Sequence, residues 1–174
     1  MSYMKRILLI TLILFFNLIA FSQSTERKSK KELRAEKKEK IEKSVQELLK
    51  TNQFTFVVRK ANPTIGPSIT LTSDYEIKIS GDSVNSYLPY FGEAYRIEYG
   101  DSDGGIKFKT HLYDYEIEFN EKKKFYEIQF KVIEAFETYR VYLNISSSGY
   151  GNLKIMSNAR QAISYDGILD MLLK

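Results

Sequence analysis

The chain has 174 residues, of which 43% are hydrophobic and 28% are charged, and its formal net charge is +4. It contains one histidine and no cysteine, which excludes disulfide bonds, thiol catalysis, cysteine metal sites and a lipid anchor on cysteine. The positive charge belongs to the first 50 residues, because residues 51–174 hold 14 basic and 16 acidic residues. We therefore expect no nucleic-acid partner.

Residues 1–22 have the pattern of a secretory signal peptide. Lys5 and Arg6 precede an apolar run over residues 7–20, and small residues stand just before Gln23. The run is short for a membrane span, which needs about 20 apolar residues. We expect cleavage near Ser22/Gln23, a periplasmic or secreted protein, and no transmembrane span in the mature form. The alternative is an uncleaved N-terminal anchor.

Residues 23–52 predict a helix rich in lysine and glutamate. Ser29 and Glu32 form a Ser-x-x-Glu capping pattern, which marks a helix start. Apolar residues appear only in the second half, at the helical spacing that predicts packing against another element. The helix should therefore begin exposed to solvent and end against the following domain. The apolar residues are Ile41, Val45, Leu48 and Leu49.

Residues 53–174 predict an antiparallel β-domain. Apolar and polar residues alternate in successive segments, which is typical of strands with one buried face. Gly81-Asp82 predicts a two-residue hairpin turn, and residues 120–124 and 146–151 predict longer loops. We expect an all-β fold, an antiparallel meander closing into a barrel-like or sandwich domain. Near the end of the chain, Ile163 and Tyr165 fit a short strand, and residues 168–173 fit a strand or one helical turn.

The aromatic residues fall into two groups. Five tyrosines share the phase of the apolar strand residues and are expected in the core: Tyr75, Tyr113, Tyr115, Tyr126 and Tyr139. A second group follows no strict period around Pro89 and Gly92, which interrupt strand pairing. It could plug one end of a barrel or line a pocket for an apolar or sugar-like ligand. These candidate ligand-binding residues are Tyr87, Tyr90, Phe91, Tyr95 and Tyr99.

No catalytic or metal-binding set is complete. Asp101 and Asp103 begin like a calcium loop, but Ile106 and Leu112 replace the glycine and the glutamate that such a loop requires. If a metal binds, these two aspartates are the candidates; we expect none, and no cofactor. His111, the single histidine, is insufficient for a zinc site and lacks a nucleophile motif. Glu116 and Glu118 have a spacing near that of glycosidase carboxylates, and the same spacing occurs on any solvated strand.

The segments "SGDSVNSYLPYFGEAY" and "GGIKF", with the signal and the charged helix, resemble the domain of unknown function 4251 family of exported Bacteroidetes-type proteins. The resemblance implies export and no assigned activity. We expect a non-enzymatic exported protein that binds a small apolar or sugar-like ligand or an envelope partner. The alternative is a structural module that uses the charged helix as a docking arm, and a hydrolase is the third interpretation.

Overall fold

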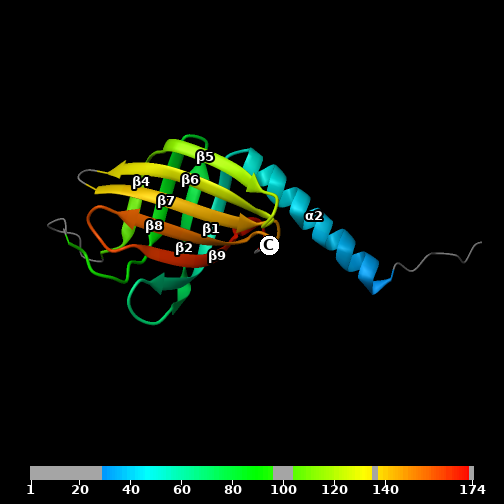
Figure 1. Cartoon of the computed structure of the whole chain (residues 1–174), viewed down its shortest axis with the longest axis horizontal. Helices are drawn as coiled ribbons and strands as arrows, with labels where there is room; N and C mark the ends of the chain where they lie inside the picture. The colour runs from blue at the N-terminus through cyan, green and yellow to red at the C-terminus, as the bar shows by residue number, and fades with distance from the viewer. Residues whose placement is uncertain (1–28, 96–103, 135–136, 173–174) are drawn as a thin grey trace, which may run out of the picture. The chain divides into compact units, whose positions relative to one another are not determined.

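The computed structural model describes residues 29–95, 104–134 and 137–172 (Figure 1). These residues form one α-helix, nine strands and a final 3-10 helix at Asp170–Leu172. No helix in these ranges is long and apolar enough to cross a membrane. The helix is α2 (Lys30–Lys50), and the strands are β1 (Gln53–Pro63), β2 (Ile69–Ser80), β3 (Ser83–Leu88), β4 (Ile106–His111), β5 (Tyr113–Asn120), β6 (Phe125–Glu134), β7 (Glu137–Ser146), β8 (Tyr150–Ser157) and β9 (Ile163–Leu169).

All nine strands belong to one antiparallel sheet, which confirms the predicted all-β fold preceded by a helix. The order is β4-β3-β2-β1-β9-β8-β7-β6-β5, so β1 pairs with both β2 and β9. The two ends of this order approach each other where β4 lies beside β6. The sheet therefore curls into a nearly closed barrel (Figure 1).

The connection between β4 and β5 does not reverse the chain. If each strand ran opposite to the strand before it in the sequence, β1 and β9 would run in the same direction. They are instead antiparallel. The pairings therefore require β4 and β5 to run in the same direction, and the single residue Leu112 joins them. Asp114 has a φ of 52°, and the β5–β6 register shifts between Tyr113 and Glu116. The two strands are thus one long strand with a sharp bend.

This bend changes which side chains of β5 face the interior. Tyr113 is 47% exposed, and the expectation that it belongs to the core is wrong. The register shift that follows Tyr113 places it out of phase with Ile117, which packs against the core. Tyr139 is buried as expected, and Tyr75, Tyr115 and Tyr126 are partly buried.

The core fills the barrel with side chains from the inner face of the sheet. In β1 the buried residues Phe54, Phe56 and Val58 alternate, and a bulge between Val58 and Lys60 restores the inward phase at Ala61. This alternation is the period-2 pattern that the sequence predicts.

Two glycines make room for the Phe56 ring. Gly151 of β8 and Gly167 of β9 are register partners. A Cβ atom at Gly167 would lie 2.3 Å from the Val57 carbonyl oxygen and 2.8 Å from the Phe56 ring, and one at Gly151 would lie 2.4 Å from the Asn144 carbonyl oxygen. Only glycine permits this close approach of backbone and ring.

The chain divides into two compact units, residues 1–37 and residues 38–174. In the first unit the capping box forms as its sequence pattern predicts. The Ser29 amide donates to Glu32 Oε2 at 2.8 Å, and the Glu32 amide donates to Ser29 Oγ at 3.2 Å. In the second unit the remaining part of α2 packs against the barrel, because Val45 and Leu49 are fully buried in the same core as the strands.

We predict that Leu49→Ala lowers the free energy of unfolding by about 2–5 kcal/mol, because it removes buried methyl groups and leaves a cavity. Leu33→Ala on the same helix is the matched control. Leu33 is 52% exposed, so its change should stay within about 0.5 kcal/mol. Urea denaturation followed by circular dichroism measures both. Equal midpoints for the two variants would show that α2 does not contribute to the core.

Candidate functional site

The aromatic stretch predicted as a ligand site divides between the surface and the interior. Tyr87 of β3 is 48% exposed on the outer face of the sheet. The centroids of the Tyr87 and Tyr75 rings are 5.4 Å apart, and Lys107 Nζ lies 5.2 Å from the centroid of the Tyr87 ring. Tyr95 is 66% exposed. Tyr99, Asp101 and Asp103 lie outside the described residues.

Tyr90 and Phe91 turn toward the domain. Phe91 packs against the core, and the Tyr90 hydroxyl lies 2.9 Å from the Glu93 carbonyl oxygen and 3.1 Å from that of Gln161. Burial raises the pKa of Tyr90. The segment after β3 is therefore held against the β8–β9 connection, an arrangement typical of a plug.

A buried ion pair supports this plug, and nothing in the sequence pattern indicated it. Arg160 donates from Nε to Glu137 Oε1 at 2.8 Å and from Nη2 to Oε2 at 2.9 Å. Its Nη1 donates to the Gly104 carbonyl oxygen at 2.9 Å, and the guanidinium carbon lies 5.1 Å from the Tyr90 ring centroid. The two side chains are only 11% and 6% exposed. Arg160 thus joins three segments that are distant in sequence.

Tyr165 adds a second anchor at the same end of the barrel. Its ring is fully buried, and its hydroxyl donates to the Pro89 carbonyl oxygen at 2.7 Å. Burial strongly raises the pKa of Tyr165 and also raises that of Tyr139, whose hydrogen bond with Glu137 adds to the shift. These tyrosines stay neutral and act as hydrogen-bonding groups.

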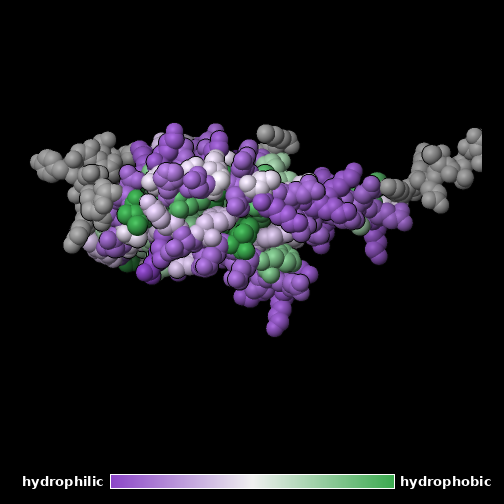
Figure 2. All heavy atoms as spheres, turned by 90° about the horizontal axis from the view of Figure 1, so that it is seen from above, coloured by the Kyte–Doolittle hydropathy of each residue, from purple (hydrophilic) through white to green (hydrophobic). Residues whose placement is uncertain are grey.

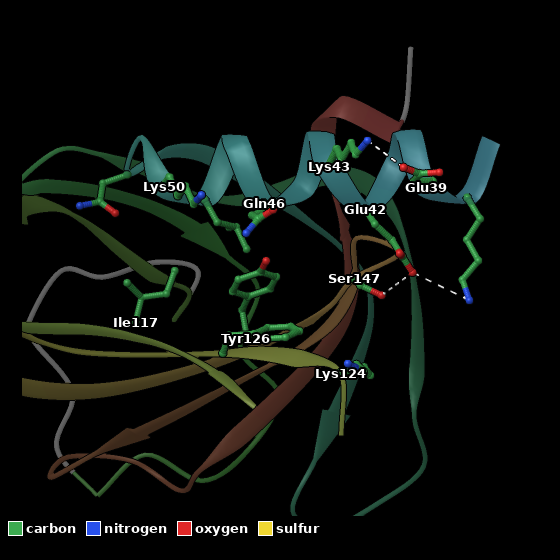
Figure 3. Close-up of a pocket in the computed structure, with 13 residues that line it drawn as sticks. Glu39, Glu42, Lys43, Gln46, Lys50, Ile117, Lys124, Tyr126 and Ser147 are labelled. Atoms are coloured by element: carbon green, nitrogen blue, oxygen red, sulfur yellow. Dashed lines mark hydrogen bonds and ion pairs between the residues drawn. The ribbon is translucent and has the colours of Figure 1, made fainter. Parts of the chain in front are cut away.

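Helix α2 and the β5–β6 hairpin enclose a groove at the opposite end of the barrel (Figure 3). The groove has a volume of about 980 Å³, within the usual size range of small-molecule sites. Its floor is apolar, with the Phe119 and Tyr126 ring centroids 4.7 Å apart and Ile117 and Leu49 beside them. Burial raises the pKa of Tyr126, and the nearby Glu42 carboxylate adds to the shift.

The rim of the groove is polar and charged. Glu42 accepts a hydrogen bond from Ser147 Oγ at 3.1 Å, and its carboxylate lies 3.8 Å from Lys38 Nζ (Figure 3). Lys43 Nζ lies 2.7 Å from Glu39. The side chains that complete the rim are Gln46, Lys50, Asn52 and Lys124. An apolar floor with hydrogen-bonding groups around it suits a ligand that has both apolar and polar parts.

The described residues contain no group of three His, Cys, Asp or Glu side chains that could hold a metal ion. His111 lies at the end of β4, well exposed, with Nδ1 3.6 Å from Asp82 Oδ2. Asp82 itself is 85% exposed, so this pair is a solvated contact at the β2–β3 turn. Glu116 and Glu118 are exposed on β5, and Glu116 accepts a hydrogen bond from Gln129.

We predict that Arg160→Met lowers the free energy of unfolding by about 3–5 kcal/mol, because the Glu137 carboxylate would remain buried without its partner. The double variant Arg160→Met/Glu137→Leu should recover most of this loss. Arg140→Met, at an exposed position of β7, is the control and should change little. Guanidinium denaturation measures all three. A double variant as unstable as the single one would show that the lost stability does not come from the unpaired carboxylate.

The fold and these sites can be compared with known proteins. A family model described as a domain of unknown function, DUF4251, matches residues 36–169. A solved DUF4251 family protein from Bacteroides eggerthii has a similar structure, with a TM-score of 0.58 and 13% sequence identity over 74% of this chain and 86% of that chain. None of the curated proteins compared matches. At this identity the structural likeness shows the fold alone, but the family model covers most of the sequence, and the chain therefore belongs to the DUF4251 family.

Proposed function

We propose that this protein is an exported, non-enzymatic binding protein whose groove between α2 and the β5–β6 hairpin holds a small apolar or sugar-like ligand. The observation that carries the proposal is the groove itself, with about 980 Å³ above a floor of paired aromatic rings. The groove is suited to binding because its aromatic rings offer a large apolar surface and its rim offers polar contacts.

The aromatic floor and the polar rim would contact different parts of such a ligand. The faces of Phe119 and Tyr126 can receive an apolar group or the C–H face of a sugar ring. Gln46 and Ser147 line the same groove and can hydrogen-bond hydroxyl groups. The lysines of the rim can donate hydrogen bonds to a ligand, and the glutamates of the rim can accept them.

The groove is a better candidate than the aromatic stretch that the sequence indicated. Tyr90 and Phe91 are held in place by backbone contacts and by the core, so displacing them for a ligand would break those contacts. A ligand role for Tyr87, Tyr95 and Tyr99 stays a prediction. A hydrolytic role would require a positioned acid and base, and the exposed contact of His111 with Asp82 does not supply one.

We predict that the protein isolated from its native source begins at Gln23 and is found outside the cytoplasm. The reason is the basic, apolar and small-residue order of residues 1–22. Intact-mass spectrometry of periplasmic, membrane and culture-medium fractions measures this directly. A full-length mass that includes Met1, found in the cytoplasmic fraction, would contradict export.

We predict that Gln46→Trp abolishes ligand binding, because the indole would fill the groove above the aromatic floor. Ser44→Trp is the matched control, since Ser44 is an exposed polar residue of α2 that does not line the groove. The probes are p-nitrophenyl glycosides, which join an aromatic ring to a sugar, and calorimetry measures their binding.

The same probes report hydrolysis through released p-nitrophenol. We expect binding without release. Binding that is equal in the Gln46→Trp and Ser44→Trp variants would place the ligand elsewhere, and steady p-nitrophenol release would favour a hydrolase.

A further inference from the structure

Strand β5 has an edge that no other strand covers. β5 stands at one end of the sheet order, and its only strand neighbour in the described structure is β6. The strand at the other end, β4, pairs with β3 and also lies beside β6. No strand pairing covers the edge of β5 that faces away from β6, so the backbone donors and acceptors along this edge have no strand partner. Such an edge is a template for another strand.

The side chains of β5 are also incompletely packed. Among the nine described strands, β5 alone has no fully buried residue. Tyr113 and Phe119 are 47% and 41% exposed. The view from above in Figure 2, onto the side where β5 lies in Figure 1, shows apolar patches among polar atoms. The strand thus combines free backbone groups with exposed apolar side chains.

Apart from Tyr113, the outward side chains of β5 are acidic. They are Asp114, Glu116 and Glu118, and β5 contains no basic residue. Asp114 pairs with Lys131, and Glu116 accepts from Gln129. Glu118 has no ion-pair partner among the described residues and stands directly opposite Glu127 in the β5–β6 register. Like charges in directly opposed positions are destabilising, so a positive charge beside Glu118 and Glu127 would be favourable.

The acidic side chains of β5 favour some strands over others as a neighbour at its free edge. In antiparallel pairing of two β5 strands, opposed residues point to the same face, so carboxylates of one copy would oppose carboxylates of the other. A second copy is therefore disfavoured. A strand with lysine or arginine on that face would instead pair with Glu116 and Glu118 and relieve the Glu118–Glu127 repulsion.

We propose that the free edge of β5 binds an extended segment of a partner protein in which basic residues alternate with apolar residues. The segment adds to the sheet as a further strand. Its basic side chains lie beside the outward carboxylates, and its apolar side chains lie beside Ile117 and Phe119. Backbone hydrogen bonds supply affinity and the alternating side chains supply specificity, as in other cases of strand addition. The proposal does not rest on a ligand in the groove.

The test uses three synthetic peptides and the mature full chain. The first is Lys-Val-Lys-Val-Lys-Val-Lys, the second replaces each lysine by glutamate, and the third carries N-methyl groups on alternate backbone nitrogens of the lysine peptide. We expect the lysine peptide to bind and the glutamate peptide to bind about tenfold more weakly. N-methylation should also weaken binding about tenfold, because it removes strand hydrogen bonds while leaving the charge intact. Calorimetry measures the affinities.

A charge-reversal variant gives the matched comparison. Glu116→Lys/Glu118→Lys should reverse the preference toward the glutamate peptide, whereas Glu47→Lys, an exposed change on α2, should leave it unchanged. Equal affinity for the parent and N-methylated peptides would overturn strand addition, as would an unchanged preference in the double variant. A dimer of the unmodified protein that pairs through β5 in NMR would show that the occupant is a second copy. Binding of aryl glycosides is measured separately, so either proposal can fail alone.

Discussion

The antiparallel pairing of β1 with β9 is the constraint on which the rest of the domain depends. It joins the meander β1–β4 to the meander β5–β9, and it fixes the directions of all nine strands. Given those directions, β4 and β5 must run the same way, and the chain meets this requirement by bending one long strand at Leu112. Because of the bend, β4 pairs with β3 but β5 does not. One edge of β5 is therefore left without a strand partner.

The two ends of the barrel are sealed by different physical means. At the end that contains Tyr90, a bidentate Arg160–Glu137 pair and the Tyr165 hydroxyl hold irregular backbone in place. This arrangement is sensitive to substitution, because removing any one partner leaves a buried polar group without its hydrogen bond. At the other end, α2 covers the core through Val45 and Leu49. The groove lies beside this apolar contact, between α2 and the β5–β6 hairpin.

The sequence predicts the features that depend on local pattern. The alternation in β1, the Ser29–Glu32 cap and the Gly81-Asp82 turn all follow from preferences of a few neighbouring residues. The features that the sequence did not predict depend on partners far along the chain. Arg160 and Glu137 stand 23 positions apart in unrelated segments, and each alone resembles a surface charge. The exposed Tyr113 depends on a register shift that alternation cannot reveal. The groove requires α2 and the β5–β6 hairpin to meet in space.

The extent of the open edge is determined by the β2–β3 hairpin. Its tight turn at Gly81 and Asp82 makes Ser83 the first residue of β3, and Ser83 is already paired with His111, the last residue of β4. The Leu112 amide then donates to the Asp82 carbonyl oxygen at 2.8 Å, in the turn itself. No residue of this hairpin extends far enough to pair with Tyr113–Asn120. A longer hairpin would close the barrel and bury Ile117 and Phe119, so the short turn preserves both the floor of the groove and the free edge of β5.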